Sequence, residues 1–78
     1  MAPFRLELTA HAKFRMKQRS ITRQQIRSAL SAPDERILQE GELMIVRKQF
    51  THSTLRVGYI PVKLGYKVVT AYWEDMYP

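Results

Sequence analysis

The chain of 78 residues contains no cysteine, which excludes disulfides, thiolate zinc sites and cysteine nucleophiles. Its three glycines form neither a P-loop nor a GxGxxG motif. Two histidines and seven carboxylates show no metal-ligand spacing, so we expect neither a metal nor another cofactor. Residues 1–10 show no pattern of a secretory signal, so we expect none, and no apolar run comes near the ~20 residues that span a membrane. We therefore expect one cytoplasmic domain covering residues 1–78, without a membrane partner.

The positive charge is concentrated at the N-terminal end of the chain. The net charge is +6; residues 1–32 hold seven cations and one anion, whereas residues 33–78 hold six of each sign. A local basic block is typical of proteins that bind a polyanion, and nucleic acid is the commonest polyanion. A basic surface that serves only solubility is the alternative.

The first third of the chain predicts a short strand followed by a helix. Apolar residues alternate with charged ones over residues 4–8, which indicates a strand. Residues 10–19 lack Gly and Pro and consist mostly of good helix formers, so they predict a helix. Its core-facing residues are expected to be Ala10 and Phe14, with Ile21 just beyond it.

A second helix is predicted over residues 23–32, and strands follow it. Thr22 and Gln25 form a capping box, and Pro33 ends the helix. Glu40-Gly41-Glu42 reads as a turn, and Pro61 limits a strand or marks an edge. Strand formers are concentrated in four later segments, residues 36–39, 43–50, 55–59 and 67–73.

This order, β-α-α-β-β-β-β, predicts an α+β fold. The connections between the later strands are short, and short connections favour antiparallel hairpins. We expect the two N-terminal helices to pack on one face of a four- to five-stranded, mainly antiparallel sheet.

The first predicted helix carries the clearest candidates for chemistry. His11, Arg15 and Arg19 are spaced four residues apart, so they form one polar stripe along the helix. A histidine can move a proton near neutral pH, and guanidinium groups can clamp phosphate oxygens. The same spacing is common in solvated basic helices, and that reading stays open.

The predicted strands offer further polar groups. Lys48, Arg56 and Thr70 are expected to share one face of the sheet, and Tyr72 shares the face of Thr70. His52, in a polar loop, is either a second acid or base or a solvated residue. Trp73 and Tyr77 could stack on bases or, for Trp73, pack in the core. The candidate nucleic-acid contacts are Lys13, Lys17, Arg23, Arg27, Lys48, Arg56 and Tyr72.

Two kinds of nucleic-acid function fit these residues. An enzyme that uses no metal would cleave RNA, because the 2′-hydroxyl of RNA supplies the nucleophile that DNA lacks. The two helices, joined by a short turn, also have a helix-turn-helix outline, whose groove-reading residues would be Arg23, Gln24, Arg27 and Ser28. The strands that follow, in place of a third helix, argue against a DNA-binding regulator.

The segment His11-Ala-Lys-Phe-Arg15-Met16-Lys-Gln-Arg19-Ser-Ile21 follows the pattern His-x-x-x-Arg-Met-x-x-Arg-x-Ile. It resembles the small bacterial domain of unknown function 4258 family. Pro33, Gly41 and Thr70-Ala71-Tyr72 match further elements of that family, and the similarity covers roughly residues 9–73.

The resemblance implies a fold similar to the RelE-like and colicin-type ribonuclease toxins, acting on RNA without a metal. Carried over by position, His11 would be the acid or base, Arg15 and Arg19 the phosphate clamps, and Thr70 a partner on the sheet. We therefore expect a metal-independent ribonuclease that binds RNA and pairs with an antitoxin protein. The alternative is a non-catalytic module that binds RNA or protein.

Overall fold

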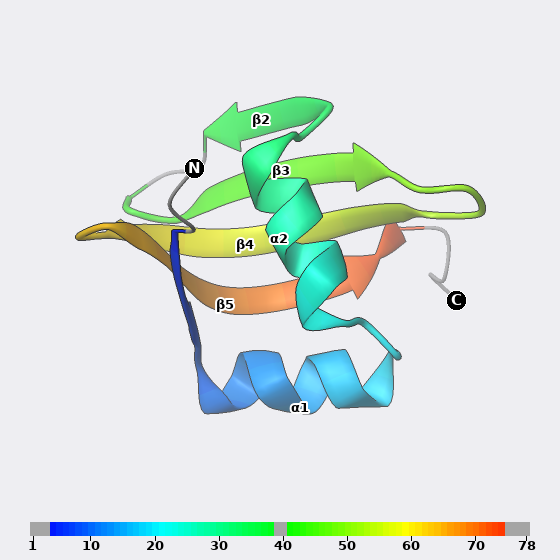
Figure 1. Ribbon diagram of the computed structural model, residues 1–78, viewed down its shortest axis with the longest axis horizontal. Helices are drawn as coiled ribbons and strands as arrows, with labels where there is room; N and C mark the ends of the chain where they lie inside the picture. Colours follow the sequence, from blue (N-terminus) through cyan, green and yellow to red (C-terminus); the bar gives the residue numbers. More distant parts are fainter. Residues whose placement is uncertain (1–3, 39–40, 75–78) are drawn as a thin grey trace.

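The structure is a computed structural model that describes residues 4–38 and 41–74 (Figure 1). Within these residues two helices and five strands follow one another as β-α-α-β-β-β-β, so the predicted α+β fold class is confirmed. Gln39, Glu40 and Tyr77 lie outside the described residues. Neither described helix is long and apolar enough to cross a membrane. The elements are β1 (Arg5–Leu8), α1 (Ala10–Gln18), α2 (Arg23–Ser31), β2 (Glu35–Leu38), β3 (Met44–Gln49), β4 (Thr54–Val62) and β5 (Gly65–Trp73).

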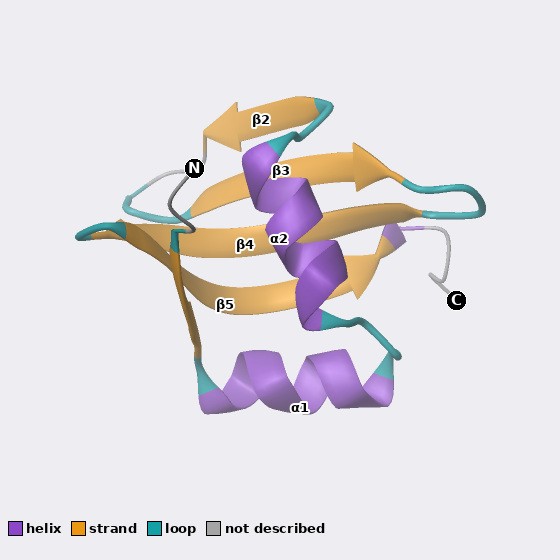
Figure 2. Cartoon of the chain, in the orientation of Figure 1, coloured by secondary structure: helices purple, strands orange, loops and turns teal. Residues whose placement is uncertain are grey.

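The strands form one mixed sheet in the order β1-β5-β4-β3-β2. The strands from β2 to β5 are antiparallel neighbours, as predicted, whereas β1 runs parallel to β5. A tight hairpin cannot join parallel strands, and here both helices follow β1 in the chain before the strands β2 to β5 begin (Figure 2). The first strand of the chain is thereby placed beside the last one.

Helix α1 lies along the part of β5 that follows its pairing with β1 (Figure 1). The register of β1 against β5 ends at Val68. Thr9, the N-cap of α1, donates a hydrogen bond through its hydroxyl to the carbonyl of Val69, at 3.3 Å. At the other end of the helix, the indole Nε1 of Trp73 donates to the carbonyl of Arg19, at 3.0 Å. The helix is therefore tied to β5 at both ends.

Helix α2 crosses one face of the sheet over β3 and β4 (Figure 1). The predicted capping box is present: Gln25 N donates to Thr22 Oγ1 at 3.1 Å, and Thr22 N donates to Gln25 Oε1 at 2.9 Å. At the C-terminal end, Lys48 Nζ donates to the carbonyl of Ala32 at 2.9 Å. A cation there also interacts favourably with the helix dipole. The buried residues of α2 are Ile26, Ala29 and Leu30.

The core is formed by residues of both helices and of the sheet face they cover. In α1 the buried residues are Ala12 and Met16. The prediction that Ala10 and Phe14 face the core is wrong, because Ala10 is exposed and Phe14 is 62% exposed, whereas Ile21 is buried as predicted. The apolar pattern of this helix is too weak to predict which side is buried, and in the structure Ala12 and Met16 form that side.

Strand β4 is longer than its sequence pattern predicts. It continues through Pro61 to Val62 and pairs with β5 over this stretch. The register between β3 and β4 ends at Tyr59, so β4 beyond that point has β5 as its described neighbour. Pro61, which has no N–H, therefore lies at a local edge of the sheet, where proline is tolerated.

The close approach of β1 to β5 requires a glycine at position 65. A Cβ at Gly65 would lie 1.9 Å from the carbonyl oxygen of Arg5, and backbone cannot move aside as a side chain can. We expect Gly65→Ala to separate the two strands and to lower the free energy of unfolding by about 1–3 kcal/mol, the usual cost of overpacking. Urea unfolding followed by circular dichroism measures this loss.

Gly58→Ala is the control for this prediction. A Cβ at Gly58 would meet the methyl group of Thr70 at 3.0 Å, and this side chain can rotate away. The loss of stability should therefore be smaller than for Gly65→Ala. Equal losses in the two variants would contradict the requirement for a close β1–β5 contact.

Candidate functional site

The candidate site is built on one side of α1, and we call His11, Arg15 and Arg19 the basic stripe. His11 is exposed, and the two arginines are half-buried. Arg15 Nε donates to His11 Nε2 over 3.5 Å, and Arg15 Nη1 donates to Gln18 Oε1 at 3.2 Å. The predicted four-residue spacing therefore brings the imidazole and a guanidinium into contact on the helix surface.

Arg19 connects the basic stripe to β5. Its Nη1 donates to the carbonyl of Ala71 at 3.3 Å, and its guanidinium carbon lies 6.0 Å from the centre of the Tyr72 ring. These contacts hold the guanidinium at the edge of the sheet. Tyr72 lies on the sheet face opposite the helices, which we call the open face. The stripe and the tyrosine thus form one continuous surface.

The other helix residues that we predicted to contact nucleic acid fall into two groups. Lys13, Lys17 and Arg23 are exposed, so their charges face solvent. Arg27 instead donates from Nη1 to the carbonyl of Phe4 at 3.0 Å, and its guanidinium lies 5.0 Å from the centre of the Phe4 ring. Arg27 therefore holds the segment that precedes β1 against α2, which is a structural role.

The prediction that Lys48 and Arg56 share one face of the sheet is wrong. In the register between β3 and β4, Lys48 pairs with Leu55, and Arg56 pairs with Arg47. Because side chains alternate along a strand, Lys48 lies on the face that carries α2 and Arg56 lies on the opposite face. The residues of the β3–β4 loop set this register, and a shift of one position reverses every face.

Arg56 belongs to an ion-pair cluster on the open face of the sheet. Arg47 Nε donates to Glu74 Oε2 at 2.7 Å, and Arg47 Nη1 also binds Glu35. Arg56 Nη1 lies 3.6 Å from Glu74 Oε1. Hydrogen bonds to Glu74 and then to Glu35 raise the pKa of Arg47 above its usual value. Two carboxylates thus balance two guanidinium charges here.

Thr70 lies on the open face, as Tyr72 and Arg56 do. It pairs with Gly58 in the register, and Tyr72 pairs with Arg56. The predicted common face of Thr70, Tyr72 and Arg56 is therefore confirmed. No hydrogen bond joins Thr70 to His11 among the residues that the structure describes.

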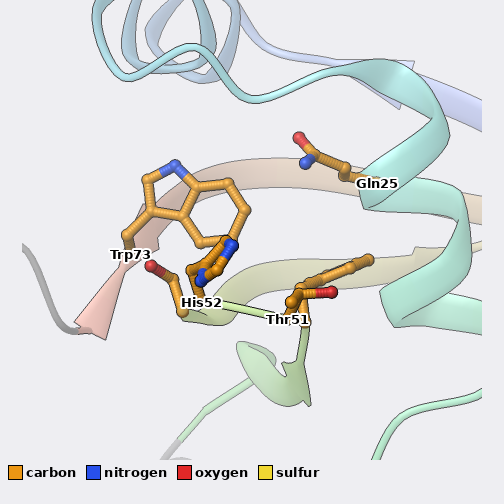
Figure 3. Close-up of a pocket in the computed structure, with 6 residues that line it drawn as sticks. Gln25, Thr51, His52 and Trp73 are labelled. Atoms are coloured by element: carbon orange, nitrogen blue, oxygen red, sulfur yellow. The ribbon is translucent and has the colours of Figure 1, made fainter.

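A pocket of about 350 Å³ opens between the first turn of α2 and the loop that joins β3 to β4 (Figure 3). Trp73 and His52 lie on one side of it and the amide of Gln25 on the other. We call it the loop pocket, and its lining residues are Gln25, Phe50, Thr51, His52, Ser53 and Trp73.

The loop pocket could not be found from the sequence. Its residues come from three segments that only folding brings together, and Gln25 is explained there by the capping box. The sequence indicates this pocket only through the polar loop around His52. The two histidines lie on different elements, His11 on α1 and His52 in the loop pocket, and no hydrogen bond joins them in the described part of the chain.

Comparison with protein families gives a match over most of the chain. A family model described as "Domain of unknown function (DUF4258)" matches residues 8–73. Curated proteins give no significant match, and neither do solved structures. The match covers both helices, the basic stripe, β2 to β5 and all residues of the loop pocket. The chain therefore belongs to the DUF4258 family, as its His-x-x-x-Arg-Met pattern predicts.

Proposed function

We propose that this protein binds RNA through the phosphate groups of a single strand that lies along the basic stripe. The observation that carries the proposal is the separation of charge between α1 and the sheet. In residues 4–38 and 41–74 the ion pairs join Arg47 and Arg56 to Glu35 and Glu74, and none includes a cation of either helix. The helix charges are thus left for an external polyanion.

The surroundings of the stripe favour single-stranded RNA over duplex DNA. Tyr72 lies beside Arg19, and aromatic rings next to cations are typical of surfaces that bind unpaired bases. In a helix-turn-helix protein α2 would enter the major groove, but Arg27 of this helix is bound to Phe4. The proposal includes a location in the cytoplasm, where RNA is abundant.

Cleavage of the bound RNA is the second candidate, and the contact between Arg15 and His11 favours it. When Arg15 moves to a phosphate oxygen, Nε2 of His11 is released and can take the proton of the 2′-hydroxyl. The 2′-oxygen then attacks phosphorus, the bond to the 5′-oxygen breaks, and a 2′,3′-cyclic phosphate forms. Arg15 and Arg19 would stabilise the charge on the phosphate oxygens, and a protonated group or water would supply the proton to the 5′-oxygen.

A toxin of the RelE-like or colicin type would combine this activity with a protein antitoxin. Such an antitoxin would need acidic residues to cover the basic stripe. A companion reading frame beside the gene would support this form of the proposal. A module that binds RNA without cleaving it needs no such partner.

The salt dependence of binding tests the role of the stripe. Arg15→Ala should weaken binding to single-stranded RNA. It should also reduce the log–log salt slope by about 0.7, the value for one phosphate contact. Fluorescence anisotropy of a labelled oligonucleotide at several salt concentrations measures both quantities.

Arg36→Ala is the matched control for Arg15→Ala. Arg36 is an exposed arginine on β2, at the opposite edge of the sheet from α1. The variant should keep the affinity and the salt slope of the wild type. The proposal fails if both variants lose the same affinity, or if the wild-type affinity does not change with salt.

Cleavage is tested with tRNA and a structured messenger RNA in excess EDTA. If His11 is the acid or base, His11→Ala should lose a factor of about 10²–10⁴ in rate and should bind RNA nearly as well as the wild type. Product analysis should find 2′,3′-cyclic phosphate ends.

Two results would decide against cleavage by His11. Equal rates for wild type and His11→Ala would show that another group, or a contaminant, cleaves the RNA. No cleavage by either protein, together with salt-sensitive RNA binding, would leave RNA binding as the function.

A further inference from the structure

We propose that the loop pocket receives one unstacked nucleobase of the RNA strand whose phosphates lie on the basic stripe. The inference rests on the proposed function and adds to it a subsite for a base. Its basis is the combination of aromatic walls, hydrogen-bonding groups and a direct connection to Arg19.

The aromatic part of the loop pocket is made by Phe50 and Trp73. Their ring centres are 6.0 Å apart and their planes are nearly perpendicular, at 82°. Proteins recognise unpaired bases by stacking them on such rings. Because Trp73 Nε1 donates to the carbonyl of Arg19, the indole has a fixed orientation before any ligand arrives. A preorganised ring loses little entropy on binding.

The polar part of the pocket offers both donors and acceptors. Gln25 Oε1 is occupied by the N–H of Thr22, so the amino group of Gln25 is the part of the amide left for a ligand. His52 contributes an imidazole, and Thr51 and Ser53 contribute hydroxyls. The edge of a nucleobase carries carbonyl and ring-nitrogen acceptors as well as amino donors, so it matches this set.

Arg19 links the pocket to the basic stripe. Its side chain is the last guanidinium of the stripe. Its backbone carbonyl oxygen accepts a hydrogen bond from Trp73 Nε1 at 3.0 Å. The guanidinium of Arg19 itself contacts the carbonyl of Ala71, two residues before Trp73 on β5, so a strand with a phosphate on Arg19 reaches the end of β5 that carries Trp73. Arg23, two residues before Gln25 in the chain, is a further exposed cation of α2.

The size of the loop pocket agrees with a single base. Its volume of about 350 Å³ is at the lower end of the ~300–1,000 Å³ found for small-molecule sites. The residues that line it include no carboxylate and no lysine or arginine. A charged metabolite would therefore find no fixed counter-ion inside, whereas a neutral base needs none.

Trp73 is the single tryptophan of the chain, so its fluorescence reports on the pocket directly. The probes are a short single-stranded RNA, 2′-O-methylated to prevent cleavage, and inorganic polyphosphate of similar length. We expect the RNA to quench Trp73. Polyphosphate should compete with the RNA for the stripe but leave the fluorescence unchanged.

His52→Ala is the variant that tests the pocket, because His52 is exposed and its removal leaves the core intact. Loss of one hydrogen bond should weaken RNA binding about three- to tenfold and leave polyphosphate binding unchanged. Gln49→Ala is the control: Gln49 is also exposed and lies next to the loop, but it does not line the pocket. This variant should behave like the wild type.

The outcomes separate this inference from the proposed function. If RNA binds in a salt-sensitive way but polyphosphate quenches Trp73 equally, or His52→Ala binds like the wild type, the base subsite is wrong and RNA binding stands. If RNA does not bind but free adenosine quenches Trp73, the proposed function is wrong and the pocket is a base site of another kind. If RNA does not bind and adenosine does not quench Trp73, both proposals are overturned.

Discussion

The edge of β5 is shared between a strand and a helix, and the other features of the molecule depend on this arrangement. β1 pairs with the first half of β5 as far as Val68, and the chain then turns at Thr9 into α1. Gly65 makes the arrangement possible, because a side chain at this position would collide with the backbone of Arg5. Hydrogen bonds from Thr9 to Val69 and from the Trp73 indole to the end of α1 fix the helix beside the second half of the strand.

The position of α1 determines which of its charged side chains face solvent. The buried side of the helix, Ala12 and Met16, faces the core, so His11 and Arg15 remain at the surface. On the open face of the sheet, by contrast, the guanidinium of Arg47 is bound by two carboxylates, those of Glu35 and Glu74. A polyanion that approaches the protein therefore meets uncompensated charge on α1 and balanced charge at the cluster of Arg47 and Arg56, which favours binding along the helix.

Predictions from local signals agree with the structure more often than predictions that depend on strand register, of which one is confirmed and one is wrong. The capping box of Thr22 and Gln25 is formed as predicted, because it involves residues three apart on one helix. The prediction that Lys48 and Arg56 share a face is wrong, because it depends on how two strands align across a loop. The prediction that Phe14 faces the core is also wrong, because the sequence of a short, weakly amphipathic helix does not indicate which side will contact the sheet.

Four properties follow from the sequence alone: the order of helices and strands, the capping box of the second helix, the excess of positive charge near the N-terminus and the family. These depend on neighbouring residues, whose propensities and hydrogen bonds act within a few positions of one another. The parallel pairing of β1 with β5 and the hydrogen bond from Arg27 to the carbonyl of Phe4 could be seen only in the folded structure. The same holds for the pocket that residues 25, 50–53 and 73 line. These contacts join segments far apart in the chain, and only the packing of the whole core fixes their alignment.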